Sequence, residues 1–205
     1  GNSGFDGSHD DQILRYDYAF GDFGFSVSYE QANDGGSAKQ DDNIGVGVSY
    51  TTNFNGVDLY TSLAYQKGSR KFEFDPDDFD EFDDYVNGNV WGVSVAADFG
   101  NGFQAGLNYS KFDYKTVTLE GTGVNAGETT RVSADYKHYG IGLAYEIDAW
   151  TFAANWGKYN RKDAPNEDGY GLVVNYDLGG GAVIQAGYGN GESIESWSFG
   201  VAMSF

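Results

Sequence analysis

The sequence predicts an all-β protein, an antiparallel transmembrane β-barrel, from three observations. The segment 195–205 alternates large apolar residues with small or polar ones, so one face of this strand favours hydrocarbon and the other favours water. Short and long connections alternate along the chain, as turns and outer loops do in membrane barrels. Aromatic residues stand at both ends of the expected strands. Together these features favour a barrel over a soluble β-sandwich whose Tyr and Trp residues cap a core.

The same period-two alternation recurs along the chain and marks eleven strands. Residues 1–11 are rich in Gly, Asp and Ser and are expected to form a loop, and 12–205 to form a single barrel domain. Tight turns at 21–22 and 179–181 join paired strands. Longer polar connections are expected at 31–41, 68–88, 116–130 and 159–168. The expected strands are 12–20, 23–30, 44–50, 57–66, 91–99, 103–110, 139–145, 150–156, 170–176, 182–188 and 195–205.

Each expected strand has one face that is rich in large apolar residues, with small or polar residues between them. On the first four strands this face carries Leu14, Tyr16, Tyr18 and Phe20; Phe23, Phe25, Val27 and Tyr29; Ile44, Val46, Val48 and Tyr50; and Val57, Leu59, Leu63 and Tyr65. On the next four it carries Trp91, Val93, Val95 and Phe99; Phe103, Leu107 and Tyr109; Tyr139, Ile141, Leu143 and Tyr145; and Trp150, Phe152 and Trp156. On the last three it carries Tyr170, Leu172, Val174 and Tyr176; Ile184 and Tyr188; and Trp197, Phe199, Val201, Met203 and Phe205.

Aromatic side chains gather at two levels along these strands. One set lies at the ends next to the long loops and the other at the ends next to the short turns. The sets are about eight residues apart, which is roughly 25 Å along a strand. This spacing suits two interfacial girdles on either side of a thin membrane. The expected girdle residues are Trp91, Phe99, Phe103, Tyr109, Tyr145, Trp150, Trp156, Tyr170, Tyr176, Trp197 and Phe205.

The composition excludes several classes of protein. The 205 residues include 31 Asp and Glu against 12 Lys and Arg, a net charge of -19, which argues against a nucleic-acid partner. Aromatic residues make up 17% of the chain, which argues against disorder. No apolar run is long enough for a transmembrane helix. The first ten residues lack the features of a signal peptide, so the chain is expected to be either mature or truncated.

The strand count suggests that the chain lacks upstream strands, because bacterial barrels have an even number. The alternation, the acidic loops, the hairpin at 177–183 and the terminal Phe205 resemble the general diffusion porins of α-proteobacteria. The resemblance covers all 205 residues. It implies a sixteen-stranded homotrimer in the outer membrane, of which this chain holds the last eleven strands. It also implies that 1–11 is the tail of the inward-folded constriction loop.

Further partners follow from the same resemblance. Such a barrel would contact outer-membrane lipid and lipopolysaccharide, and the barrel assembly machinery would recognise the terminal Phe205. The small and polar positions of the strands are expected to face a hydrated lumen. The acidic excess predicts modest cation selectivity. The expected lining residues are Arg15, Asp17, Ser26, Ser28, Asp58, Ser62, Gln66, Ser94, Asp98, Gln104, Asn108, Asn155, Asn175 and Gln185.

The sequence therefore predicts an outer-membrane porin for passive diffusion of small hydrophilic solutes and ions, with no catalysis and no cofactor. One alternative is a smaller, complete barrel of about twelve strands that acts as a substrate-specific channel or an adhesin. Another is a barrel enzyme, which needs a base beside a nucleophile. His138 is the only histidine outside the N-terminal loop, and no Ser-His-acid constellation follows from its spacing. It is expected at the rim or in the lumen.

Two further motifs have competing interpretations. The acidic loop 72–85 could hold Ca²⁺ through carboxylate oxygens, but it lacks the spacing of an EF-hand and is more typical of a solvated loop. Its candidate ligands are Asp75, Asp77, Asp78, Asp80 and Glu81. The glycine-rich segment 187–191 is not followed by a helix, so it is interpreted as a strand end and turn rather than a nucleotide-binding loop.

Overall fold

The strands of the protein are seen in a computed structural model that describes residues 13–31, 38–40, 42–72, 82–120, 129–162, 165–192 and 194–204. The expectations for 1–11 and for Phe205 lie outside these residues. Among the described residues, no helix is long and apolar enough to cross a membrane. The strands are β1 (Ile13–Phe20), β2 (Phe23–Glu30), β3 (Ala38–Gln40), β4 (Asn43–Phe54), β5 (Val57–Phe72), β6 (Phe82–Asp98), β7 (Phe103–Glu120), β8 (Thr129–Ile147), β9 (Trp150–Arg161), β10 (Glu167–Gly179), β11 (Ala182–Gly191) and β12 (Ile194–Met203).

Eleven of these strands follow one another in chain order in one hydrogen-bonded sheet, from β1 through β2 and β4 to β12. The predicted antiparallel, all-β architecture is therefore confirmed. The short strand β3 was not predicted; it pairs with the far end of β5, Ala38 opposite Phe72. Three residues are too few to show an alternating pattern. In the strand order β1 and β12 are the two end members, and the predicted total of sixteen strands stays a prediction.

Several strands are longer than the sequence indicated. Residues 68–88 and 116–130 were expected to be loops, but β5 continues to Phe72, β6 begins at Phe82, β7 continues to Glu120 and β8 begins at Thr129. Likewise β9 ends at Arg161 and β10 begins at Glu167, inside the loop expected at 159–168. Polar and charged residues dominate most of these segments, so their period-two pattern is weaker than that of the central parts of the strands.

The chain divides into two compact units, and each of the strands β4 to β8 contributes residues to both. Unit 1 comprises Gly1–Ser49, Leu63–Gly92 and Lys111–Tyr136. Unit 2 comprises Tyr50–Ser62, Val93–Ser110 and Lys137–Phe205.

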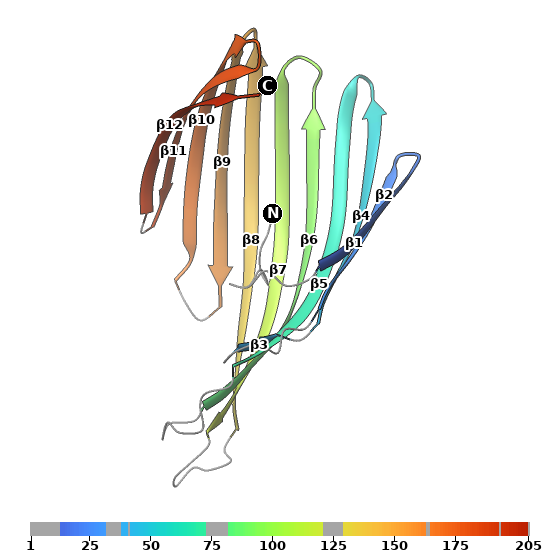
Figure 1. Ribbon diagram of the computed structural model, residues 1–205, viewed down its shortest axis with the longest axis vertical. Coiled ribbons are helices and arrows are strands. Elements are labelled where there is room, and N and C mark those ends of the chain that lie inside the picture. The colour runs from blue at the N-terminus through green and yellow to red at the C-terminus, as the bar shows by residue number, and fades with distance from the viewer. Residues whose placement is uncertain are drawn as a thin grey trace. The chain divides into compact units, whose positions relative to one another are not determined.

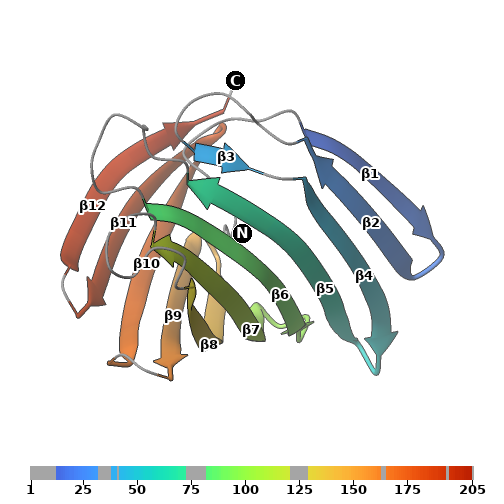
Figure 2. The same cartoon turned by 90° about the horizontal axis from the view of Figure 1, so that it is seen from below.

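In unit 2 the C-terminal strands form a continuous meander. Figures 1 and 2 show β9, β10, β11 and β12 side by side in chain order. The register pairs Trp156 with Tyr170 and Tyr188 with Trp197, so large residues meet across neighbouring strands. Such cross-strand pairs stabilise antiparallel sheets.

The short turns of unit 2 are fixed to the strand beyond their own hairpin. The Gly102 carbonyl oxygen accepts a 2.8 Å hydrogen bond from the backbone N–H of Glu146, and the Gly181 carbonyl oxygen accepts one of the same length from Ser204. Gly102 and Gly181 have φ values of 85° and 83°. Only glycine adopts this backbone region without strain. These contacts hold the ends of β8 and β12 in register with the adjacent turns.

Unit 1 contains the β1–β2 hairpin, in which Ile13 pairs with Glu30 and Phe20 with Phe23. It also contains a stack of three rings on β7 and β8. The centroids of Phe112 and Tyr136 are 4.4 Å apart with an angle of 14° between the planes, and Tyr114 lies 5.6 Å from Tyr136. Phe112 is only 1% exposed. This small aromatic core lies in the extensions of β7 and β8, outside the expected strands 103–110 and 139–145 and near the loop expected at 116–130.

Most of the apolar side chains are exposed rather than buried. Among the described residues Phe112 is the only buried hydrophobic one, whereas Trp197 is 81% exposed and Phe199 72%. A water-soluble sandwich of this size would bury such residues in a core. Exposure of so much apolar surface fits a sheet that is solvated by lipid on one face.

Candidate functional site

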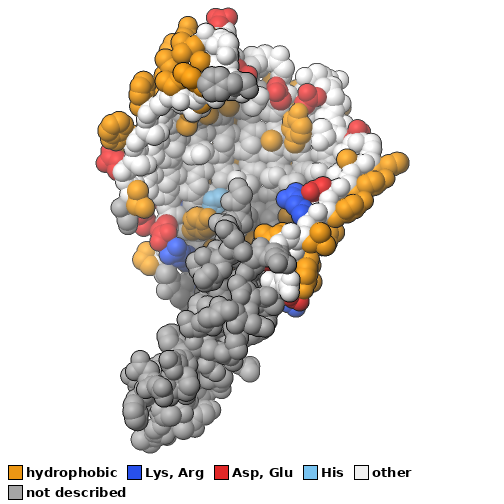
Figure 3. Space-filling model, viewed as in Figure 1, with side chains coloured by type: hydrophobic (Ala, Val, Ile, Leu, Met, Phe, Trp, Pro, Cys, Tyr) orange, Lys and Arg blue, Asp and Glu red, His pale blue; other side chains and the backbone are white. Residues whose placement is uncertain are grey.

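The two faces of the sheet differ in the kind of side chain they carry. Along β2 exposed Phe23, Phe25, Val27 and Tyr29 alternate with half-buried residues. In the space-filling view, hydrophobic side chains stand along the margins, and the face toward the viewer is mainly white, the colour of backbone and uncharged polar groups (Figure 3). The candidate functional site is this polar face.

The polar side chains of this face lie over glycines of the neighbouring strand. A Cβ atom placed on Gly171 of β10 would be 2.8 Å from the Asn155 Oδ1 atom of β9. A Cβ on Gly47 of β4 would be 2.7 Å from the Ser26 hydroxyl of β2. Both distances are shorter than a normal contact, so a larger residue at either position would require the polar side chain to move. The glycines therefore leave room for the polar groups that the neighbouring strands carry.

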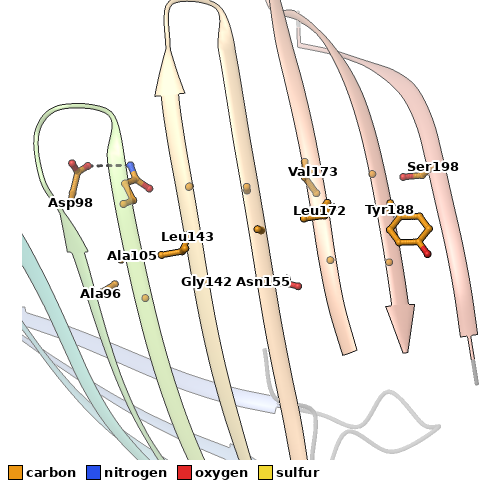
Figure 4. A pocket seen from close by; sticks show the side chains of 18 of the residues that line it. Ala96, Asp98, Ala105, Gly142, Leu143, Asn155, Leu172, Val173, Tyr188 and Ser198 are labelled. Carbon is orange, nitrogen blue, oxygen red and sulfur yellow. Dashed lines mark hydrogen bonds between the residues drawn. The ribbon is translucent and has the colours of Figure 1, made fainter. Parts of the chain in front are cut away.

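A hollow of about 830 Å³ lies on the polar face of unit 2, over strands β5 to β12. Its floor includes Gly142 and Ala96, and Asn155 and Ser198 border it (Figure 4). The Asp98 carboxylate belongs to this hollow. Small residues on the floor keep the space open, and polar groups around it keep it hydrated.

The Asp98 carboxylate is held in place from two sides. The Gln104 side-chain amide donates a 3.1 Å hydrogen bond to Oδ2, shown as a dashed line in Figure 4. The backbone N–H of Gly100 donates a 2.8 Å bond to Oδ1. These bonds fix the carboxylate without neutralising it, so it remains a source of negative potential.

Other predicted lining residues form local pairs. Ser62 and Ser94 hydroxyls on β5 and β6 are hydrogen-bonded at 2.7 Å. In unit 1, Arg15 and Asp17 on β1 form an ion pair of 2.8 Å, in which the two charges largely cancel. The Asp58 carboxylate of β5 accepts a 2.7 Å bond from Asn53.

The structure places the predicted lining residues on strands in positions that alternate with the apolar ones. The β1–β2 register sets Arg15 opposite Ser28 and Asp17 opposite Ser26, and the β10–β11 register sets Asn175 opposite Gln185. The hollow of unit 2 collects Asp98, Gln104 and Asn155. A second hollow collects Ser94 and Asn108 with Asn155. The residues that border neither are Arg15, Asp17, Ser26, Ser28, Asp58, Ser62, Gln66, Asn175 and Gln185. That all fourteen line a channel stays a prediction.

The expected girdle residues form ring contacts at both ends of the unit 2 strands. Next to the short turns, Phe99 lies 5.4 Å from Phe103, and Trp150 lies 4.6 Å from Tyr176, measured between centroids. At the opposite ends, Tyr109 contacts Tyr139 at 5.2 Å, and Tyr170 contacts Tyr188 at 6.0 Å.

Three further girdle residues, Tyr145, Trp156 and Trp197, are exposed, and Trp91 of unit 1 is partly exposed. The Trp156 indole N–H donates a 3.2 Å bond to Asp168. A ring with one apolar and one hydrogen-bonded side suits a membrane interface.

The larger hollow is also bordered by Tyr60, Ser196 and Ser198, which were not predicted as lining residues. His138, which was expected at the rim or in the lumen, borders the smaller hollow. Strand alternation alone would have placed the two serines, because they alternate with Trp197. The candidate calcium ligands Asp75, Asp77, Asp78, Asp80 and Glu81 lie outside the described residues.

The fold is shared with several outer-membrane proteins of known structure. A porin refined at 1.8 Å resolution matches with a TM-score of 0.69 and 22% identity over 97% of this chain. A loop-deletion mutant of OmpT, an outer-membrane protein of Vibrio cholerae, matches with a TM-score of 0.58 and 16% identity over 93% of the chain. The toluene transporter TodX of Pseudomonas putida matches with a TM-score of 0.53 and 10% identity over 94% of this chain. This chain covers 73% of the length of TodX. The chain spans 63% of the length of the first of these proteins and 62% of the second.

No curated protein is significantly similar to the chain in sequence. Residues 1–194, however, match the family described as Gram-negative porin. The family match and the outer-membrane β-barrel structures that share the fold assign the protein to the bacterial outer membrane. Such a location requires strands with one apolar and one polar face. The chain belongs to the Gram-negative porin family.

Proposed function

We propose that the protein forms a water-filled channel in the outer membrane through which small hydrophilic solutes and ions diffuse passively, with modest cation selectivity. The observation that carries this proposal is the segregation of side chains between the two faces of one sheet. Apolar residues are exposed on one face, and the other face holds a hollow of about 830 Å³ with a glycine and alanine floor. Membership of the Gram-negative porin family supports the same function.

Solute uptake into liposomes tests the channel directly. The natural protein is reconstituted and vesicle swelling is recorded in sugars of increasing size. Diffusion through a hydrated pore predicts rates that fall smoothly with solute size and depend little on chemistry. Impermeable vesicles that contain correctly folded protein would contradict the proposal. Permeability to one solute class alone would instead favour a substrate-specific channel.

The assembly proposed here is a sixteen-stranded barrel in a homotrimer. Two facts support the strand number: the chain forms eleven consecutive strands, and it spans 63% of a structurally similar porin. The natural protein is then expected to be larger than these 205 residues by about five strands and their loops. Mass spectrometry of the protein extracted from outer membranes checks the size, and crosslinking in mild detergent checks the trimer. A monomer after crosslinking would contradict the trimer alone.

Asp98→Asn is expected to lower the preference for K⁺ over Cl⁻, because it removes a fixed negative charge beside the hollow and keeps the shape of the side chain. We expect a decrease of about twofold in the permeability ratio at low salt and a smaller one at high salt, where the charge is screened. Reversal potentials in planar bilayers measure the ratio. Asp148→Asn is the matched control, since Asp148 lies in the β8–β9 turn and borders neither hollow. Equal effects of the two variants would argue against a local role for Asp98.

A further inference from the structure

The second hollow on the polar face of unit 2 has a volume of about 440 Å³ and lies over strands β6 to β9. Its floor consists of glycines, among them Gly106, Gly140 and Gly142, and its polar side chains come from Ser94, Asn108, Asn155 and His138. Among the described residues, those that line it include no Asp, Glu, Lys or Arg. The volume is within the range of small-molecule sites. This hollow is therefore an uncharged region in a strongly acidic protein.

Two of the polar groups of this hollow lie over glycines of a neighbouring strand. The Asn108 amide lies next to Gly140, with Nδ2 2.5 Å and Oδ1 2.8 Å from the position that a Cβ atom would have there. The His138 Nε2 atom lies 3.1 Å from the same position on Gly157. The absence of a side chain at Gly140 and Gly157 leaves the space that these two polar groups occupy.

These groups remain available to a solute. Within the part of the chain that the structure describes, no protein hydrogen bond is recorded for the side chains of Asn108, Asn155 or His138. The amides carry donors as well as acceptors, and imidazole can act as both. The centroid of the His138 ring lies 4.5 Å from that of Tyr159 of β9, with the two ring planes tilted by 40°, so an aromatic ring contacts one of the polar groups.

We propose that this hollow is a weak binding site for neutral, hydroxyl-rich solutes such as short oligosaccharides, an inference that rests on the channel function proposed above. Hydroxyl groups donate and accept hydrogen bonds, which matches the two amides and the imidazole. The absence of charged residues from the lining removes the interaction that would select ions. Shallow, hydrated hydrogen bonds give affinities on the order of millimolar, which is compatible with rapid passage.

The test is single-channel conductance of the natural protein in planar bilayers at pH 7.5, with maltotriose added in steps. Binding predicts a saturable decrease in current, whereas polyethylene glycol of the same hydrodynamic size should give a decrease that rises in proportion to concentration. His138→Ala and Asn108→Ala are each expected to raise the half-saturating maltotriose concentration about threefold to tenfold, the loss of one hydrogen bond. Lys137→Ala is the control, because Lys137 is exposed and does not line the hollow.

The outcomes separate this proposal from the channel function. Folded protein that carries no current contradicts the channel function and this site with it. Normal current with no saturable decrease contradicts the binding site alone. The binding site is also contradicted if His138→Ala and Asn108→Ala bind maltotriose as tightly as the natural protein does. Heat-modifiable migration checks that both variants are folded. Two variants on different strands keep the test valid should one of them fail to fold.

Discussion

Gly181→Ala is expected to destabilise the barrel by about 3 kcal/mol. Two effects combine at this turn. Gly181 has a φ of 83°, a conformation that alanine adopts only with strain. An added Cβ would also overlap the Ser204 carbonyl group, which belongs to backbone and cannot move aside without disturbing β12. Urea unfolding of the natural protein and of the Gly181→Ala variant in phospholipid bilayers measures the loss of stability. Heat-modifiable migration of the protein reports the folded fraction at each urea concentration.

Gly180→Ala is the matched control for this substitution. Gly180 is the preceding residue, has a φ of 64° and has no atom within 4 Å of an added Cβ. It should therefore show the cost of the backbone conformation alone, about 1 kcal/mol. Equal losses for the two variants would mean that the contact between the β10–β11 turn and Ser204 contributes nothing to stability.

Leu172→Arg is expected to reduce stability in the membrane by about 2–4 kcal/mol, because it places a charge on the lipid face of β10. Leu172 is exposed and lies between the girdle residues Tyr170 and Tyr176, so the charge would stand in the apolar span between the two expected girdles. The yield of folded protein in bilayers and its unfolding by urea measure the effect.

Val173→Arg, one residue along the same strand, should cost less than about 1 kcal/mol, because a strand turns successive side chains to opposite faces. Both positions are labelled on β10 in Figure 4. The Val173 variant is instead expected to narrow the hollow and to lower conductance. If Val173→Arg were the more damaging of the two, the assignment of lipid and lumen faces would be inverted.

The faces of the strands and the positions of the short turns could be read from the sequence. Both depend on local rules: alternation requires only that lipid lies on one side, and the glycines at 179–181 mark a turn by their own conformational freedom. For this reason the eleven main strands and residues such as Asp98 and Asn155 were assigned correctly to strands. The extensions of β5 to β8 were missed, since the polar and charged residues that dominate most of them weaken the alternating signal.

The sequence by itself determined the all-β class of the protein, the period-two alternation of apolar and polar residues along its strands, and the positions of the short turns. Only the tertiary structure decided which polar groups meet, because that depends on the register between strands that alternation does not specify. It set Asn155 over Gly171, brought Asn108 and His138 to one hollow, and fixed the Gly181 turn against Ser204. These contacts join residues on different strands, and their geometry follows from backbone pairing across the sheet.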